Sequence, residues 1–181
     1  KALVRDSFQC IVTGSYDWQS VNQSHELEQE VCDSHSQICY SECAHILPAN
    51  DIDAKHYDAS FWTIIKCFDH QDLFEKLISD GIHALDNVMT FSYDIYMMFN
   101  TLKLWFEAIE NTYMIQAAKS YYLDKCKANP ITLTTQYPNL PLPNPTYLRI
   151  HAACCRVAYL SGIAEYMEET LDGLDNIEVL S

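Results

Sequence analysis

Apolar side chains recur at three- and four-residue spacing in two long stretches of the chain. The first stretch begins at Asp58 and ends before Gly81. The second begins at Thr146, which we expect to cap the helix, and continues to about Met167. Such spacing places the apolar side chains on one face of an α-helix. The pattern therefore predicts two amphipathic helices, each with one buried face.

Short apolar segments between these stretches predict strands. Residues 43–48 form one segment, and Pro48 ends it because proline cannot donate a hydrogen bond to a strand ladder. Residues 87–91 predict a second strand. Ser92 then has the side chain of a helix N-cap, which predicts a short helix that continues to Asn100.

The rest of the chain predicts shorter elements. Residues 102–109 and 112–118 predict a β-hairpin with its turn at residues 110–111. Residues 3–13 predict a helix or a strand, and residues 25–31 predict a short helix. The expected organisation is a domain of residues 1–127, a proline-rich extended connector of residues 128–146, and a C-terminal helix within residues 147–181 that packs on the same domain.

The composition is that of a folded chain. Hydrophobic residues make up 49% of the 181 residues and aromatic residues 12%, which is enough to bury a core. Four Gly against twelve Tyr disfavour an all-β fold built from many tight turns. No apolar run approaches the roughly 20 residues that a membrane helix needs, so we expect no membrane partner.

The charge disfavours nucleic acid as a ligand. The formal net charge is −14, from 25 acidic residues against 11 Lys and Arg. Nucleic-acid binding depends on cations that displace counterions from phosphates, and here the cations are scattered. The nearest approach to a basic stripe is Lys119, Lys125 and Lys127. The overall field would slow the approach of a phosphate backbone, although a local basic groove stays open as an alternative.

Eight cysteines are present, and a chain of this size can build a core without disulfides. We therefore expect reduced thiols, which favours an intracellular location without fixing a compartment. Cys39 and Cys43, with Cys10 and His35, could be drawn as a zinc site. Their spacing matches no CxxC pair, so ordinary reduced cysteines are the preferred interpretation.

One order of residues points to chemistry. A short strand carries His45, a long insertion follows, and then come Asn87, a strand and the helix of residues 92–100. This is the order of a ββα-metal motif. In such a motif a His on the first strand deprotonates a water molecule, and an Asn holds the connecting loop through backbone hydrogen bonds. The helix supplies ligands for one divalent ion that stabilises the transition state.

The chain resembles the fungal HNH-nuclease-like family well beyond these residues. The resemblance covers most of the chain in order, including "RDSFQCIVTGSYD", "AHILP", "SFWTIIKCF", "DGIHALDNVMTFSYDIYMMFNTLKLWFE", "NTYMI" and "LPNPTYLRIHAACCRVAYLSGIAEYM". It implies an α+β fold with a ββα-metal (HNH-like) core. It also implies a long helical insertion between the two strands, a following β-hairpin and a C-terminal helix.

The resemblance assigns roles residue by residue. His45 takes the general-base position and Asn87 the loop-organising position. The His that usually binds the metal is replaced by Tyr96, whose phenol, with an unperturbed pKa of about 10, is a poor ligand for Mg²⁺ or Zn²⁺. Ala44 stands where many HNH enzymes place a carboxylate, and Asn100 offers one neutral oxygen. We therefore expect no cofactor and no metal ligand set, with weak divalent-metal binding left open.

Three functions remain open. The first is a metal-independent enzyme on a small organic metabolite, acting by proton transfer, cyclisation or elimination. His45 would be its acid/base and Tyr96 its proton donor or oxyanion partner, with Asn100, Ala44 and Phe99 as possible substrate-binding residues. The alternatives are a residual metal-dependent nuclease and a catalytically silent interaction module.

The other histidines are expected to be structural or solvated. His151 lies on the predicted C-terminal helix near two cysteines, and core packing is the preferred interpretation. His35, His56, His70 and His83 lie in polar stretches and are expected to face solvent. Phe99 and its apolar neighbours on the short helix are expected to belong to the core more often than to a ligand pocket.

Overall fold

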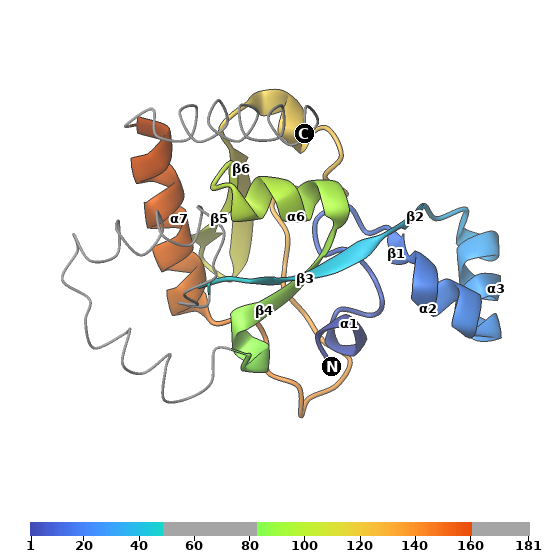
Figure 1. The fold of residues 1–181 in the computed structure, drawn as a ribbon. Coiled ribbons are helices and arrows are strands. Elements are labelled where there is room, and N and C mark those ends of the chain that lie inside the picture. The colour runs from blue at the N-terminus through green and yellow to red at the C-terminus, as the bar shows by residue number, and fades with distance from the viewer. Residues whose placement is uncertain (49–82, 161–181) are drawn as a thin grey trace, which may run out of the picture.

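The computed structural model describes residues 1–48 and 83–160 (Figure 1). Within them, helices combine with three two-stranded sheets, which confirms the predicted α+β class. The helix predicted from Asp58, the helical insertion expected between the strands, and the part of the C-terminal helix predicted beyond residue 160 lie outside the described residues.

The antiparallel pair of β3 (Ser41–His45) and β4 (Val88–Ser92) is the centre of the described structure. Ser41 pairs with Ser92 at one end and His45 with Val88 at the other. The second strand begins and ends one residue later than predicted, at Val88 and Ser92. The first begins two residues before the predicted start and ends at His45, after which the buried residues Ile46 and Leu47 leave the ladder.

Helix α6 (Tyr93–Asn100) follows β4 directly and packs on the hairpin. Ser92 is its N-cap residue, as predicted. The Ser92 hydroxyl donates to the Asp94 carboxylate at 2.6 Å instead of accepting a backbone N–H. Asp94 lies in the first turn of the helix, where its negative charge is favourable beside the positive end of the helix dipole.

A second hairpin, β5 (Leu104–Ile109) and β6 (Thr112–Ala117), confirms the prediction for this region, with Glu110 at the turn in the left-handed conformation. Helix α7 (Pro145–Leu160) packs against β5. The sequence suggests Thr146 as its cap, which is wrong. Asn144 caps the helix, because its side-chain oxygen accepts the Thr146 N–H at 2.9 Å. Pro145 follows at the first helical position, where its missing N–H costs nothing.

The segment between the second hairpin and α7 begins with a 3₁₀ turn, η2 (Ser120–Leu123), and then runs without a helix. Ile131 forms an isolated bridge with Tyr113. The Asn129 side chain accepts the Ile115 N–H at 2.8 Å and donates to the Ile115 carbonyl at 2.9 Å. Between Leu123 and Pro145 this segment contains no helix, and these contacts hold it against β6.

The N-terminal region is built from short elements. Helix α1 (Ala2–Arg5) covers only the start of the segment predicted over residues 3–13. A two-residue strand, β1 (Tyr16–Asp17), pairs in parallel with β2 (Ile38–Cys39). Helices α2 (Trp18–Gln23) and α3 (His25–Ser34) lie between them in sequence. The Asp17 and Ser24 side chains cap these helices, so the helix predicted at residues 25–31 is confirmed and extends to Ser34.

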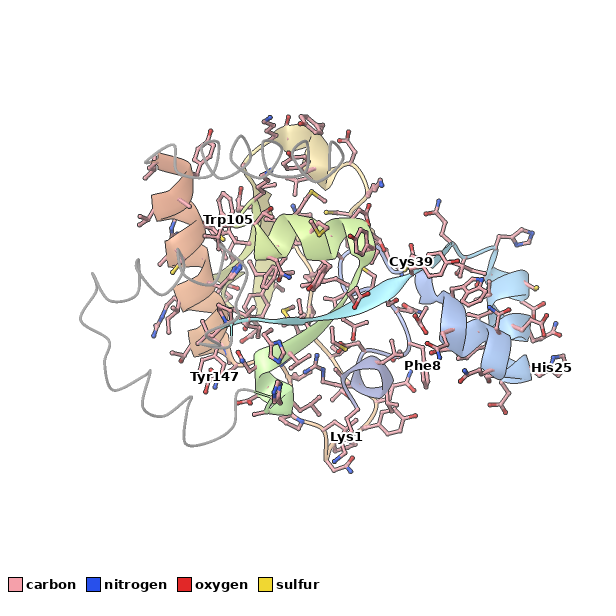
Figure 2. The ribbon with its side chains drawn as sticks, in the orientation of Figure 1. Lys1, Phe8, His25, Cys39, Trp105 and Tyr147 are labelled. Atoms are coloured by element: carbon pink, nitrogen blue, oxygen red, sulfur yellow. The ribbon has the colours of Figure 1, made fainter. Side chains whose placement is uncertain are left out.

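The hairpins, α6 and α7 enclose a common hydrophobic core. The rings of Phe91, Phe99 and Phe106 lie 5.0 to 6.1 Å apart and come from β4, α6 and β5. Figure 2 shows the side chains that fill the space between α7 and the strands, with Trp105 and Tyr147 labelled at its edge. None of the described helices has the length and apolar character needed to cross a membrane.

A buried ion pair joins the N-terminus to this core. Arg5 and Asp6 have side chains that are 0% and 3% exposed and contact each other through two nitrogen–oxygen pairs at 2.6 and 2.9 Å. The same guanidinium donates to the carbonyls of Leu85 and Val88, both at 2.7 Å. The Asp6 carboxylate also accepts the Thr90 N–H at 3.1 Å. The pair therefore fixes the 3₁₀ turn η1 (Leu85–Asn87) and the start of β4 to the N-terminal segment.

Replacing Arg5 with methionine should destabilise the fold strongly, because Asp6 would stay buried without a partner and carbonyl groups would lose their donors. We expect a loss of roughly 3–5 kcal/mol in the free energy of unfolding, measured by urea denaturation. Arg156→Met is the matched control. Arg156 pairs with Glu107 at 3.0 Å but half of its side chain is exposed, so its loss should stay below about 1 kcal/mol. Equal losses in the two variants would contradict the importance of the buried pair.

Candidate functional site

Two histidines meet where β3 ends. His45 is the last residue of β3 and is half-buried, and His83 is exposed just before η1. The His45 Nε2 and His83 Nδ1 atoms lie 3.0 Å apart, and the ring centroids are 5.1 Å apart. Because this is a hydrogen-bond distance, one nitrogen donates its proton and the other accepts it. The structure thus joins two imidazoles that are 38 residues apart in the chain.

Burial lowers the pKa of His45, and the neighbouring His83 ring lowers it further. Both effects disfavour a positive charge on this imidazole. At neutral pH His45 is therefore a neutral ring that can accept a proton. Among the described residues, neither ring of the pair has another hydrogen-bond partner.

Asn87 fixes the backbone next to this histidine pair through hydrogen bonds to Leu47. Its side-chain oxygen accepts the Leu47 N–H and its side-chain nitrogen donates to the Leu47 carbonyl, both at 3.0 Å. The Ile46 N–H donates to the Asn87 carbonyl at 2.8 Å. Asn87 is fully buried, so these hydrogen bonds are shielded from water. The amide thus holds the segment after His45 against the turn after His83.

The structure does not bring His45 to Tyr96. The Phe91 ring packs on Phe99 of α6, so this face of the hairpin lies against the helix. Ala44 shares that face, because cross-strand partners and alternate residues point the same way. His45 follows Ala44 and therefore projects from the opposite face. The pairing of His45 with a phenol on α6, expected from the sequence, is corrected to a pairing with His83.

The residues predicted on α6 lie in other surroundings. The half-buried Tyr96 ring is stacked with Tyr93 at a centroid distance of 6.3 Å. Asn100, the last residue of the helix, is also half-buried. Ala44 and Phe99 are 1% and 0% exposed and belong to the core. These two possible substrate-binding residues therefore pack against other apolar side chains and present no surface to a substrate.

The sequence offers Cys10, Cys39 and Cys43 as possible zinc ligands. In the structure they are free thiols, as are all the cysteines that the structure describes. Burial raises the pKa of both Cys39 and Cys43, which disfavours the thiolates that zinc binds. The buried Cys10 lies 3.6 Å from the Ser92 hydroxyl. Within residues 1–48 and 83–160, no group of three or more His, Cys, Asp and Glu side chains could hold a metal ion.

His151 is a core residue, as the sequence suggests. Its ring stacks on Phe99 at a centroid distance of 3.8 Å. Its Nε2 lies 3.3 Å from the Phe99 carbonyl and its Nδ1 lies 3.5 Å from the Cys155 sulfur. A carbonyl can only accept, so Nε2 carries the proton and Nδ1 is an acceptor. Complete burial lowers the pKa of His151 to about 3.

A depression of about 250 Å³ lies elsewhere, between the N-terminal segment and the connector. Its lining includes Asp6, Ser7 and Cys10 on one side and Lys127, Leu133 and Leu142 on the other. None of the residues predicted for the site contributes to it. The pocket that the sequence suggests between His45 and α6 is therefore not this one.

His83 is the residue that sequence reasoning missed. It lies in a polar stretch and was expected to be solvated, and its ring is indeed exposed. Its position carried a signal, because it precedes Asn87 by only four residues. A residue that pins the chain just after His45 must also bring its own neighbours close to His45.

No family model, no curated protein and no solved structure matches this chain.

Replacing Asn87 with aspartate should release the segment after His45. The carboxylate would lose the donor to the Leu47 carbonyl and place a charge in a buried site, which should destabilise the protein by roughly 1–3 kcal/mol. Hydrogen exchange at the Leu47 amide should accelerate more than exchange in β5. Asn22→Asp is the control, because Asn22 is exposed on α2. If the two variants matched each other in stability and exchange, Asn87 would have no such holding role.

The His151 pKa predicts a loss of stability in mild acid. Above pH 6.5 the ring is neutral in both folded and unfolded chains, so it adds no pH dependence. Below pH 6.5 the unfolded chain takes up a proton that the folded chain refuses until about pH 3. Stability should therefore fall by up to about 1.4 kcal/mol per pH unit as the pH decreases in this window. His151→Phe, which keeps a ring on Phe99, should show a shallower slope in urea denaturation between pH 7 and pH 5. Parallel slopes would show that His151 is not the group responsible.

Proposed function

We propose that this protein is a metal-independent enzyme that moves a proton on a small organic molecule, with His45 as the acid/base. The observation that carries this proposal is the hydrogen-bonded pair of His45 and His83 at the pinned end of β3. The order of β3, β4 and α6 supports the resemblance to an HNH-like scaffold, and the position of Asn87 is consistent with it.

Two hydrogen-bonded imidazoles can shift a proton without accumulating charge. When His45 Nε2–H donates to His83 Nδ1, the His45 Nδ1 is a free base and His83 carries its proton on Nε2. A substrate proton taken by His45 Nδ1 can be balanced by transfer of the Nε2 proton to His83. His83 Nε2 then returns a proton to another atom of the substrate or to water. The net result is a tautomeric shift, which suits isomerisation or elimination.

His83 takes the partner role that the sequence suggested for Tyr96. The phenol of Tyr96 lies beside Tyr93, and strand alternation directs His45 to the other face of the hairpin. Tyr96 therefore takes no part in the proposed proton transfer. It becomes a useful control, because it carries a titratable hydroxyl outside the proposed pair.

Residual metal-dependent nuclease activity is the alternative. The side chains at the positions of usual metal ligands are a phenol at Tyr96 and an amide at Asn100, which are weak ligands for hard cations. The net charge of −14 also opposes the approach of a phosphodiester. The balance of charge and ligand chemistry therefore favours an uncharged or cationic organic substrate.

Proton abstraction can be detected before a substrate is known. Pools of small carbonyl compounds would be incubated with the protein in D₂O and followed by proton NMR for loss of C–H signals. We expect proton exchange in at least one pool. This exchange should survive a chelator and should be abolished in His45→Gln. It should fall at least about 100-fold when the partner base, His83, is removed. His83→Gln should reduce it, and Tyr96→Phe should leave it unchanged. Because the pKa of His45 is lowered, exchange should decline only below pH 6.5.

Several results would overturn this assignment. Exchange at the buffer rate in every pool would remove the proposed activity and favour a catalytically silent module. Equal loss in Tyr96→Phe and His45→Gln would restore the phenol to the site. Plasmid cleavage that needs Mn²⁺ and disappears in His45→Gln would establish the nuclease alternative instead.

A further inference from the structure

Five large apolar side chains remain exposed around one corner of the molecule: Trp18, Ile38, Tyr40, Tyr93 and Met97, with exposed fractions from 41% to 70%. We call this set the aromatic face. It is formed by the start of α2, by β2 and the residue that follows it, and by the first turns of α6. Figure 1 shows β2, the start of β3 and the N-terminal end of α6 together on the side opposite α7.

Side-chain and main-chain contacts link the three chain segments that form the aromatic face. The Trp18 and Tyr40 rings have centroids 5.5 Å apart. The Tyr93 N–H donates to the Tyr40 carbonyl at 2.9 Å, which ties α6 to the residue between β2 and β3. Tyr93 stacks with the half-buried Tyr96, and Met97 follows Tyr93 by one helical turn. Three chain segments therefore contribute to one surface.

The fold does not require these side chains to be aromatic. Trp18 is the first residue of α2, whose only buried residue is Val21, and Tyr40 is 70% exposed between two strands. The main chain of Tyr40 would make its hydrogen bond to Tyr93 with any side chain. Contiguous exposed apolar surface of this kind is typical of an interaction site, and tryptophan and tyrosine are the residues that most often dominate binding energy.

Acidic groups border the aromatic face. Glu42, two residues after Tyr40, is exposed on β3. Asp94, next to Tyr93, keeps 41% of its side chain exposed while it contacts Lys125 at 2.6 Å. The whole chain carries a net charge of −14. Because the Asp94 charge is paired with Lys125, the exposed Glu42 and the net charge of −14 supply the field that repels phosphates and attracts cations.

We propose that the aromatic face binds an arginine-rich extended segment of a partner protein. A guanidinium stacks on Trp and Tyr rings and pairs with a carboxylate through two parallel hydrogen bonds. Lysine has the charge but lacks the planar group, so it matches the rings less well. The charge therefore selects a basic partner, and the rings favour arginine over lysine. This inference is independent of the proposed activity, because the face does not include His45 or His83.

Fluorescence anisotropy of labelled nine-residue peptides, alternating Gly with Arg, Lys or Glu, tests this inference. The Arg peptide should bind the full chain, the Lys peptide should bind more weakly, and the Glu peptide should not bind. Trp18→Ala and Tyr93→Ala should each weaken Arg-peptide binding about tenfold, since aromatic anchors dominate such interfaces. Glu42→Gln should weaken it less and reduce its salt dependence.

Tyr159→Ala is the matched control, because Tyr159 is a 54% exposed tyrosine on α7, away from the aromatic face. It should leave the affinity within about twofold. Circular dichroism melting would verify that every variant is folded. No binding of the Arg peptide, or an equal loss in Tyr159→Ala, would overturn the inference. Self-association that depends on Trp18, measured by sedimentation, would also overturn it, because a second copy would then occupy the aromatic face. Binding of single-stranded DNA that depends on Trp18 would overturn it as well.

Discussion

The buried contact between Arg5 and the turn of residues 85–88 is the constraint on which the rest of the site depends. A fully buried guanidinium is tolerated only when every donor finds a partner, and here a carboxylate and three backbone carbonyls supply them. Two of those carbonyls flank Asn87, whose side chain in turn holds Leu47. The Asn144 N–H also donates to the Asp86 carbonyl of the same turn at 2.8 Å, which fixes the turn from a third side. Chain segments from the N-terminus, β3 and the connector thus meet at one short turn.

Local signals were enough to predict most of the described elements. Ser92 marks the start of α6 and the turn at residues 110–111 marks the second hairpin, because each signal lies within a few residues of the element that it starts. Predictions failed where competing local signals stood side by side. Asn144 and Thr146 both resemble caps, and Pro145 between them decides in favour of Asn144, since proline fits the first helical position.

The order of His45, Asn87 and the short helix along the chain could be predicted, but the direction of the His45 side chain could not. Resemblance to an HNH-like family gave His45, Asn87 and the helix in sequence, and the structure shows Asn87 holding the chain after His45. It could not decide which face of β3 carries His45, because a single step along a strand reverses the direction of a side chain. The contacts of Arg5 with residues 80 and 83 positions away leave no local trace in the sequence either.

Local desolvation, and not the overall charge, sets the chemistry of His45. A chain with a net charge of −14 should stabilise a protonated imidazole, yet the pKa of His45 is lowered. Among the described residues, its own burial is the larger cause and the ring of His83 the smaller one. Carboxylates farther away than the screening length of about 8 Å add little at physiological salt. The acidic surface therefore does not make His45 a cation, and its burial keeps this imidazole neutral at neutral pH, as the proposed proton transfer requires.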